Sequence, residues 1–101
     1  MDRDELKQYI GHQLTLTATR GSIAPIKGNI DELKLCIENV MLDGIIVADH
    51  MWIDRCHRVK KLESKQRFKF TAIIGEYIGL NSSYEQITKI KLDKVRNVNA
   101  L

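Results

Sequence analysis

Cysteine, proline, aromatic residues and long apolar runs are all scarce in this sequence of 101 residues. Two cysteines, Cys36 and Cys56, are too few for a disulfide framework, so we expect reduced thiols in an intracellular protein. One proline and six glycines argue against long disordered segments. The apolar runs are too short to cross a membrane, and the polar start MDRDELKQ does not resemble a secretory signal. These absences predict one soluble cytoplasmic domain over residues 1–101, with no membrane partner.

Signatures of catalysis and of metal binding are also absent from the sequence. It contains no Walker loop, no G-x-G-x-x-G or G-x-S-x-G motif and no paired carboxylates of the kind that acid–base catalysis uses. Zinc ligands normally come as spaced pairs, and the available side chains show no such spacing. Those side chains are Cys36, Cys56, His12, His50 and His57. We therefore predict a protein that is not an enzyme and that has no cofactor and no metal.

The charge of the chain is unevenly distributed. The formal net charge is +3, but residues 1–54 hold five Lys/Arg and nine Asp/Glu, whereas residues 55–101 hold eleven and four. The segment from Arg55 to Lys69 alone has seven basic residues and one acidic residue, Glu63. Basic charge concentrated in this way favours a polyanionic partner, although a solvated loop has the same composition.

The stretch from Leu33 to Ile53 is the most apolar part of the chain. It breaks once, at Asp43-Gly44, and this dipeptide between two β-prone runs is typical of a tight hairpin. The inward alternation changes register near Asn39, which predicts a β-bulge around Glu38 to Val40.

Hydrophobic periodicity predicts the remaining elements. A helix over Asp2–Ile10 is followed by strands and loops in the order His12–Ile23 (strand), Ala24–Glu32 (loop), Leu33–Leu42 (strand), Ile45–Ile53 (strand), Asp54–Gln66 (polar segment), Arg67–Leu80 (strand) and Tyr84–Leu92 with Val95–Val98 (strand). In the polar segment, Val59 and Leu62 have the spacing of one helical turn. In the strand from Arg67, the residues Phe68, Phe70, Ala72, Ile74, Ile78 and Leu80 are predicted to face the core.

The predicted fold class is therefore mainly β. Five curved antiparallel strands over residues 12–98, preceded by a short helix over residues 1–10, fit a small OB-like barrel. An SH3-like barrel is the alternative. The OB order places an additional element between strands three and four, which is the position of Asp54–Gln66.

Three parts of the sequence carry a resemblance to a known group. The series NVMLDGIIVADHMWI, then FKFTAIIGEYIG, then Tyr84 and a last strand resembles small OB-like proteins of phages and mobile elements of Gram-positive bacteria. The resemblance covers roughly residues 33–98. It implies an OB-like barrel that serves replication or recombination, or a small inhibitor of a host defence system. The sequence has only six aromatic residues, fewer than the familiar single-strand-binding pattern uses.

The predicted binding residues lie in the basic half. Lys69, Thr71 and Tyr77 share the polar face of one strand with Arg67, and interleaved cations and aromatic rings are what single strands require. Basic residues of the preceding segment are placed to contact phosphates. They are Arg55, Arg58, Lys60, Lys61 and Lys65. The alternative is that the strand residues form only the solvated side of a sheet.

The string Asp49-His50-Met51-Trp52 allows two interpretations. His50 and Trp52 lie on one face of a strand, where Trp52 would stack a base and His50 would contact a base or phosphate. Alternatively, Trp52 caps the barrel and His50 bonds to Asp49 or to the main chain. We favour the structural interpretation, because aromatic side chains usually contribute core area first.

Two functions therefore remain open. The first is a nucleic-acid-binding module, with single-stranded DNA favoured over duplex. The second is a protein-interaction module, such as an inhibitor or an adaptor of a replication complex, whose charge asymmetry complements an acidic protein surface or a second copy of the chain.

Overall fold

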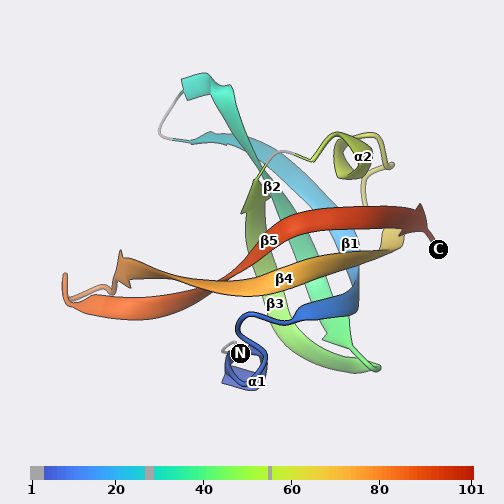
Figure 1. Cartoon of the computed structure of the whole chain (residues 1–101). Coiled ribbons are helices and arrows are strands. Elements are labelled where there is room, and N and C mark those ends of the chain that lie inside the picture. Colours follow the sequence, from blue (N-terminus) through green and yellow to red (C-terminus); the bar gives the residue numbers. More distant parts are fainter. Residues whose placement is uncertain (1–3, 27–28, 55) are drawn as a thin grey trace.

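The part of the chain that the structure describes forms five long strands and two single-turn helices (Figure 1). The structure, a computed structural model, describes residues 4–26, 29–54 and 56–101. The elements are α1 (Asp4–Lys7), β1 (Gln13–Ile26), β2 (Asn29–Leu42), β3 (Ile45–Asp54), α2 (His57–Lys60), β4 (Arg67–Leu80) and β5 (Gln86–Ala100). The prediction of a mainly β protein with five antiparallel strands is confirmed. The N-terminal helix is shorter than predicted, and residues 1–3 lie outside the described part.

All five strands belong to one sheet in the order β3-β2-β1-β4-β5, with antiparallel neighbours. The predicted closed barrel is wrong, because in the described residues no ladder joins the end strands β3 and β5. β5 is also irregular near this open side. The register with β4 shifts on both sides of Thr71, and Lys94 and Asn97 have positive φ values of 50° and 54°. Such bulges bend a strand and disrupt its ladder.

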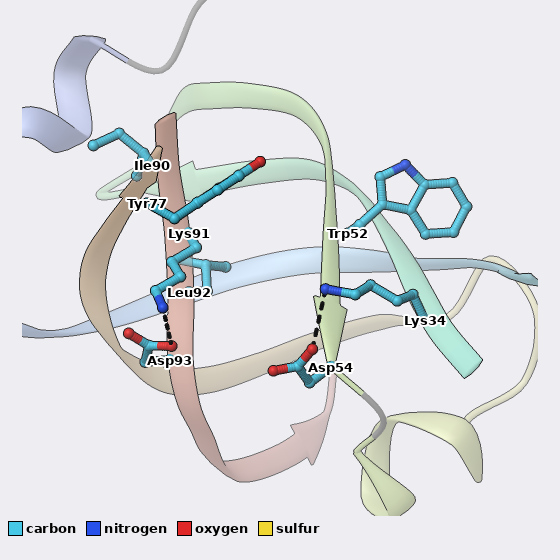
Figure 2. A pocket seen from close by; sticks show the side chains of 8 residues that line it. All are labelled: Lys34, Trp52, Asp54, Tyr77, Ile90, Lys91, Leu92 and Asp93. Atoms are coloured by element: carbon cyan, nitrogen blue, oxygen red, sulfur yellow. Dashed lines mark ion pairs between the residues drawn. The ribbon is translucent and has the colours of Figure 1, made fainter. Parts of the chain in front are cut away.

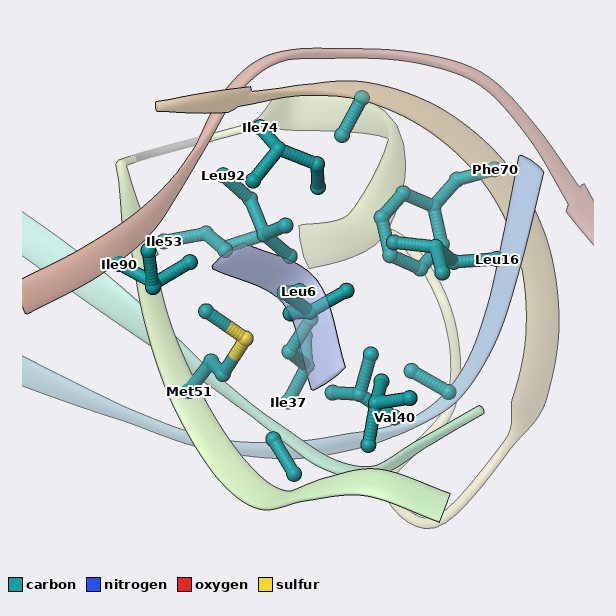
Figure 3. Packing of buried hydrophobic residues seen from close by; sticks show 14 of the residues in the cluster. Leu6, Leu16, Ile37, Val40, Met51, Ile53, Phe70, Ile74, Ile90 and Leu92 are labelled. Atoms are coloured by element: carbon teal, nitrogen blue, oxygen red, sulfur yellow. The ribbon is translucent and has the colours of Figure 1, made fainter. Parts of the chain in front are cut away.

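The strongly curved sheet wraps around one apolar core (Figure 3). Phe68, Phe70 and Ile74 alternate inward along β4, as predicted, and all three are buried. At the open side of the sheet, Ile90 and Leu92 of β5 belong to the same cluster as Met51 and Ile53 of β3. Side-chain packing thus bridges the two end strands where main-chain hydrogen bonds do not.

The two short helices are attached to this core by single apolar residues. Leu6 of α1 and Val59 of α2 are both fully buried, and Leu62 packs partly against the core. The expectation that Val59 and Leu62 form the inner side of a helical turn is confirmed. Helices of four residues are unstable alone, so this packing is what stabilises them.

The hairpin and bulge predicted in the apolar stretch are both present. Asp43 and Gly44 have φ values of 51° and 81°, the paired positive values of a type I′ turn. Asn39 has φ 48°, and the register of β2 against β1 shifts between Glu38 and Met41. The β-bulge therefore lies where the sequence placed it.

The loop predicted over Ala24–Glu32 is wrong. β1 continues to Ile26 and β2 begins at Asn29, and Pro25 pairs with Leu33 across the ladder. Pro25, Gly28, Asn29 and Asp31 together indicate a loop, and proline in particular cannot donate to a ladder. β1 pairs with β4 only over Gln13–Thr19, so Pro25 lies in a two-stranded ribbon where one side needs no donor.

The ends of β4 and β5 form a second two-stranded ribbon, which we call the β4–β5 arm. It comprises Gly75–Leu80 and Gln86–Lys91 and extends away from the rest of the sheet (Figure 1, orange). Ile78 and Leu80, predicted to be core residues, are 71% and 54% exposed because the arm extends beyond the core. The predicted face of Ile78 and Leu80 is therefore correct, but both residues lie beyond the end of the core.

Candidate nucleic-acid interface

A groove follows the open side of the sheet, between β3 and α2 on one wall and β5 on the other. It consists of three adjoining hollows of about 330, 220 and 380 Å³. The first two share Asp54 and Leu92, and the last two share Cys56 and Val95, so the hollows adjoin one another. We call them together the seam groove.

The first hollow, the aromatic end of the seam groove, has an aromatic side chain on each wall (Figure 2). Trp52 of β3 is 44% exposed and Tyr77 of β4 is 43% exposed. Trp52 lies opposite Cys36 on the outer face of the sheet, outside the core. The interpretation of Trp52 as a barrel cap is therefore wrong.

Two glycines leave the surface of β4 on either side of Tyr77 without side chains. Gly75 and Gly79 lie two residues to either side of it, on the same face of β4. A Cβ atom at Gly79 would approach Lys89 Cδ to 2.9 Å, and one at Gly75 would collide with the Asp93 carboxylate. The side chains of β5 thus lie across the glycines, and the ring of Tyr77 has no bulky neighbour along its own strand.

The cations of the aromatic end are paired with carboxylates. Lys34 Nζ lies 3.1 Å from Asp54 Oδ1, and Lys91 Nζ lies 3.7 Å from Asp93 Oδ1 (Figure 2, dashed lines). Each wall therefore presents a positive and a negative group beside its aromatic ring. This end is close to neutral, with donors and acceptors side by side.

The third hollow, the basic end of the seam groove, has a different charge pattern. It is lined by His57 and Arg58 of α2 and by Arg96 of β5, with Lys94 in the middle hollow nearby. Within the described parts of the chain, the side chains of Arg58, Lys94 and Arg96 form no ion pair and no hydrogen bond. Guanidinium groups in this state are available to bind phosphate oxygens in bidentate fashion.

The bulges of β5 are held by a side chain of β4. Thr71 Oγ1 donates to the Arg96 carbonyl oxygen at 3.4 Å and accepts from Asn97 Nδ2 at 3.0 Å. These bonds fix the segment that carries Arg96 into the basic end. Thr71, predicted to bind nucleic acid directly, thus lies behind the groove and positions a residue that lines it.

Two other predicted binding residues are occupied within the protein. The Arg67 guanidinium donates to Thr17 Oγ1 at 2.9 Å, to Thr19 Oγ1 at 3.0 Å and to the Asn39 carbonyl oxygen at 3.1 Å. It therefore ties β4 to β1 and to the bulge of β2. Lys65 Nζ lies 2.7 Å from Glu38 Oε1.

The remaining predicted residues lie in different places. Arg58 and Tyr77 line the seam groove, as does Trp52. Lys60, Lys61 and Lys69 are exposed but line none of its hollows. His50 is exposed two residues before Trp52 and has an interaction within the protein. Arg55 lies outside the described residues.

Several groove residues were absent from the prediction. They are Lys34, Asp54, Lys91, Asp93, Lys94 and Arg96. The alternating basic string KIKLDKVR in the last strand was the available signal, because Lys89 and Lys91 share a face with Tyr77.

Neither cysteine is bonded to another cysteine: Cys36 and Cys56 are both free thiols. Partial burial raises the pKa of the Cys36 thiol, and the nearby Glu38 carboxylate raises it further against an opposing effect of Lys65. Cys56 lies on the wall of the groove.

Metal ligands and membrane spans do not define the site. Across the described residues, no three His, Cys, Asp or Glu side chains gather closely enough to hold a metal ion. Neither of the helices that the structure describes has the length or apolarity needed to span a membrane. Comparison of the chain with protein-family models, with curated proteins and with solved structures finds no match. Function must therefore be inferred from the residues of the groove.

Proposed function

We propose that the protein binds single-stranded nucleic acid in the seam groove and is not an enzyme. The supporting observation is the row of adjoining hollows, which has two aromatic rings at one end and unpaired guanidinium groups at the other. Single strands require this combination of stacking platforms and a cationic path for the backbone.

At the aromatic end, both Trp52 of β3 and Tyr77 of β4 line the hollow with partly exposed rings. A base that stacks on either ring gains roughly 1–3 kcal/mol, and any base provides the π-face that this needs. The adjacent lysine–carboxylate pairs provide both donors and acceptors for the edges of the base. Binding here favours unpaired bases, since a duplex keeps their faces stacked on one another.

At the basic end, phosphates rather than bases are the natural ligands. The groove is lined by five Lys or Arg side chains against two carboxylates, and the carboxylates lie toward the aromatic end. The excess positive charge thus lies at the basic end. Each phosphate that a cation neutralises there releases counterions, so binding weakens as salt is added.

The finer assignment of the fold belongs to the same proposal. The sheet order and the position of α2 between β3 and β4 support an OB-like arrangement that is left open at the seam. OB folds bind oligonucleotides across the face formed by strands two and three and the loops beside it. Trp52 and Lys34 belong to that face here. A role in replication or recombination of a phage or mobile element rests on the sequence resemblance.

The proposal is tested by fluorescence anisotropy with a labelled single strand and its duplex, in DNA and RNA forms and at two salt concentrations. We expect the single strand to bind more tightly than the duplex, with a negative salt slope. Tyr77→Ala should weaken binding, whereas Tyr84→Ala, which removes an exposed tyrosine outside the groove, should not. Failure to bind any strand with Kd below about 100 μM at low salt would remove the proposal, because even non-specific binding is usually tighter.

A second function, a protein-interaction module that docks an acidic protein, is favoured by one observation. Large apolar side chains are exposed at the ends of two hairpins, at Ile45 and Ile46 and on the β4–β5 arm. Exposed apolar groups of this kind are typical of protein contacts. Saturable binding of an acidic protein in the absence of any oligonucleotide binding would favour this function.

A further inference from the structure

The β4–β5 arm has apolar residues on both faces, although it lies outside the core. Ile78 and Leu80 are exposed on the face that continues the core side, and Ile87 and Tyr77 are exposed on the other. At the tip, Tyr84 is 84% exposed. Exposed apolar residues gathered in this way are typical of a surface that contacts another molecule.

In the described part of the chain, the β5 edge of the arm is unpaired, as is the β4 edge beyond Ile73, and the β5 edge carries the complementary charges described below. β5 is the last strand of the sheet, so only its β4 side is in a ladder. The Glu85 carbonyl oxygen accepts from Asn81 N at 3.0 Å, which closes the hairpin. Main-chain groups alternate along an antiparallel ladder, so Ile87 and Lys89 also point toward β4, and Gln86 and Thr88 point away from it.

We infer that this edge pairs with the same edge of a second copy of the chain. In the antiparallel arrangement centred on Ile87, Gln86 of each copy exchanges main-chain hydrogen bonds with Thr88 of the other. The two Ile87 side chains then meet across the two-fold axis. The result is one continuous four-stranded ribbon made of two arms, an isologous contact with closed symmetry.

The charges of the arm favour this register over the one centred on Lys89. It places Glu85 of each copy opposite Lys89 of the other, which makes two cross-strand pairs of opposite charge. A register centred on Lys89 places two ammonium groups opposite each other and is destabilised. A lysine on an edge strand normally discourages pairing, but here a carboxylate of the second copy faces it.

The residues that form the contact differ from those of the proposed nucleic-acid site. Residues 85–89 line none of the three hollows, and the turn of the second copy comes next to Ile90 and Lys91 at the margin of the aromatic end. Two features favour a second copy of the chain as the occupant. They are the charge complementarity of Glu85 and Lys89 and the free main-chain groups of the exposed β5 edge.

Sedimentation equilibrium over a wide concentration range tests the inference. We expect a concentration-dependent dimer, about tenfold weaker in Glu85→Lys and in Lys89→Glu because each puts like charges opposite each other. The double variant exchanges the charges and should restore the dimer. At low protein concentration Lys89→Glu should leave the melting temperature unchanged, whereas Glu85→Lys also removes the acceptor of Asn81 Nδ2 and is compared with its own monomer. A monomer at all concentrations, or a dimer that neither single substitution weakens, would overturn the inference.

Crosslinking tests the register. In a background with Cys36→Ser and Cys56→Ser, Ile87→Cys should form an intermolecular disulfide on mild oxidation, because facing residues in a non-hydrogen-bonded pair are about 4.5 Å apart at Cα. Thr88→Cys is the matched control, since Thr88 faces Gln86 and not itself. Crosslinking of Thr88→Cys in place of Ile87→Cys would contradict the proposed register.

Discussion

The two ends of the seam groove differ in whether their positively charged side chains are paired with carboxylates. At the aromatic end, Lys34 and Lys91 each have an aspartate within ion-pair distance. At the basic end, Arg58 and Arg96 have no carboxylate partner among the described residues. The difference shows that counting basic residues is a poor guide to where a polyanion binds. What matters is which cations are left unpaired after folding.

The largest difference between the two ends should appear on removal of an aromatic ring. Trp52→Ala should lose roughly 1–3 kcal/mol of single-strand affinity, because a base can no longer stack there, and the salt slope should stay the same. The free energy of unfolding should change by no more than about 1 kcal/mol, since Trp52 is half exposed.

Phe70→Ala is the control for a structural effect at an aromatic residue. Phe70 is fully buried, so this variant should lose about 3–5 kcal/mol of stability in denaturant unfolding. Comparable destabilisation by Trp52→Ala would return Trp52 to the core and remove it from the groove.

Removal of an unpaired guanidinium at the basic end should, unlike removal of the aromatic ring, also change the salt slope of binding. Arg96→Ala should weaken binding by about 1 kcal/mol, nearly fivefold, and reduce the salt slope by about 0.7, because one phosphate is no longer neutralised. Lys61→Ala removes an exposed cation that lines no hollow and is the matched control. An equal reduction of the slope by both variants would mean that the groove has no special role.

Removing the carboxylate that pairs with a lysine at the aromatic end should strengthen the binding of single strands. Asp93→Asn removes the carboxylate beside Lys91 and makes the aromatic end more positive. Single strands should then bind about two- to threefold more tightly at low salt, with a steeper salt slope, because exposed ion pairs are individually weak. Weaker binding would show that the carboxylate itself contacts the ligand.

The smallest effect is expected at Thr71. Thr71→Val keeps the β-branched shape and removes the hydroxyl that bonds to the Arg96 carbonyl oxygen and to Asn97. Affinity should fall by less than it does in Arg96→Ala. In an Arg96→Ala background, Thr71→Val should have no further effect, because the two changes act on one interaction. An additive effect in the double variant would assign Thr71 a direct role in binding the strand.

Much of the fold could be predicted from the sequence, because local rules were decisive where one face of a strand is buried. Period-2 alternation located β4, and Asp43-Gly44 located the hairpin. The length of the arms could not be predicted, since alternation continues beyond the core at Ile78 and the composition does not show where the core ends. The open seam between β3 and β5 could not be predicted either, because alternation along a strand does not show whether the two end strands of a sheet pair.

The site was less predictable for a related reason. Arg67 and Lys65 were expected to bind nucleic acid, but the side chains of both bond to residues 26 or more positions away in the chain. Arg96 and Lys94 were missed because only the folded sheet brings β5 opposite α2 and β3. Charge content can be read from a sequence, whereas pairing of charges depends on tertiary contacts.

The most direct test of the seam groove uses its own fluorophore. Trp52 is the single tryptophan of the chain, so intrinsic fluorescence reports on the aromatic end alone. Titration with an unlabelled single-stranded oligonucleotide should change the emission of Trp52 in a saturable way, and the same midpoint should appear in the anisotropy of the labelled strand. Binding seen by anisotropy without any change in Trp52 emission would contradict the account, because the strand would then lie elsewhere on the protein.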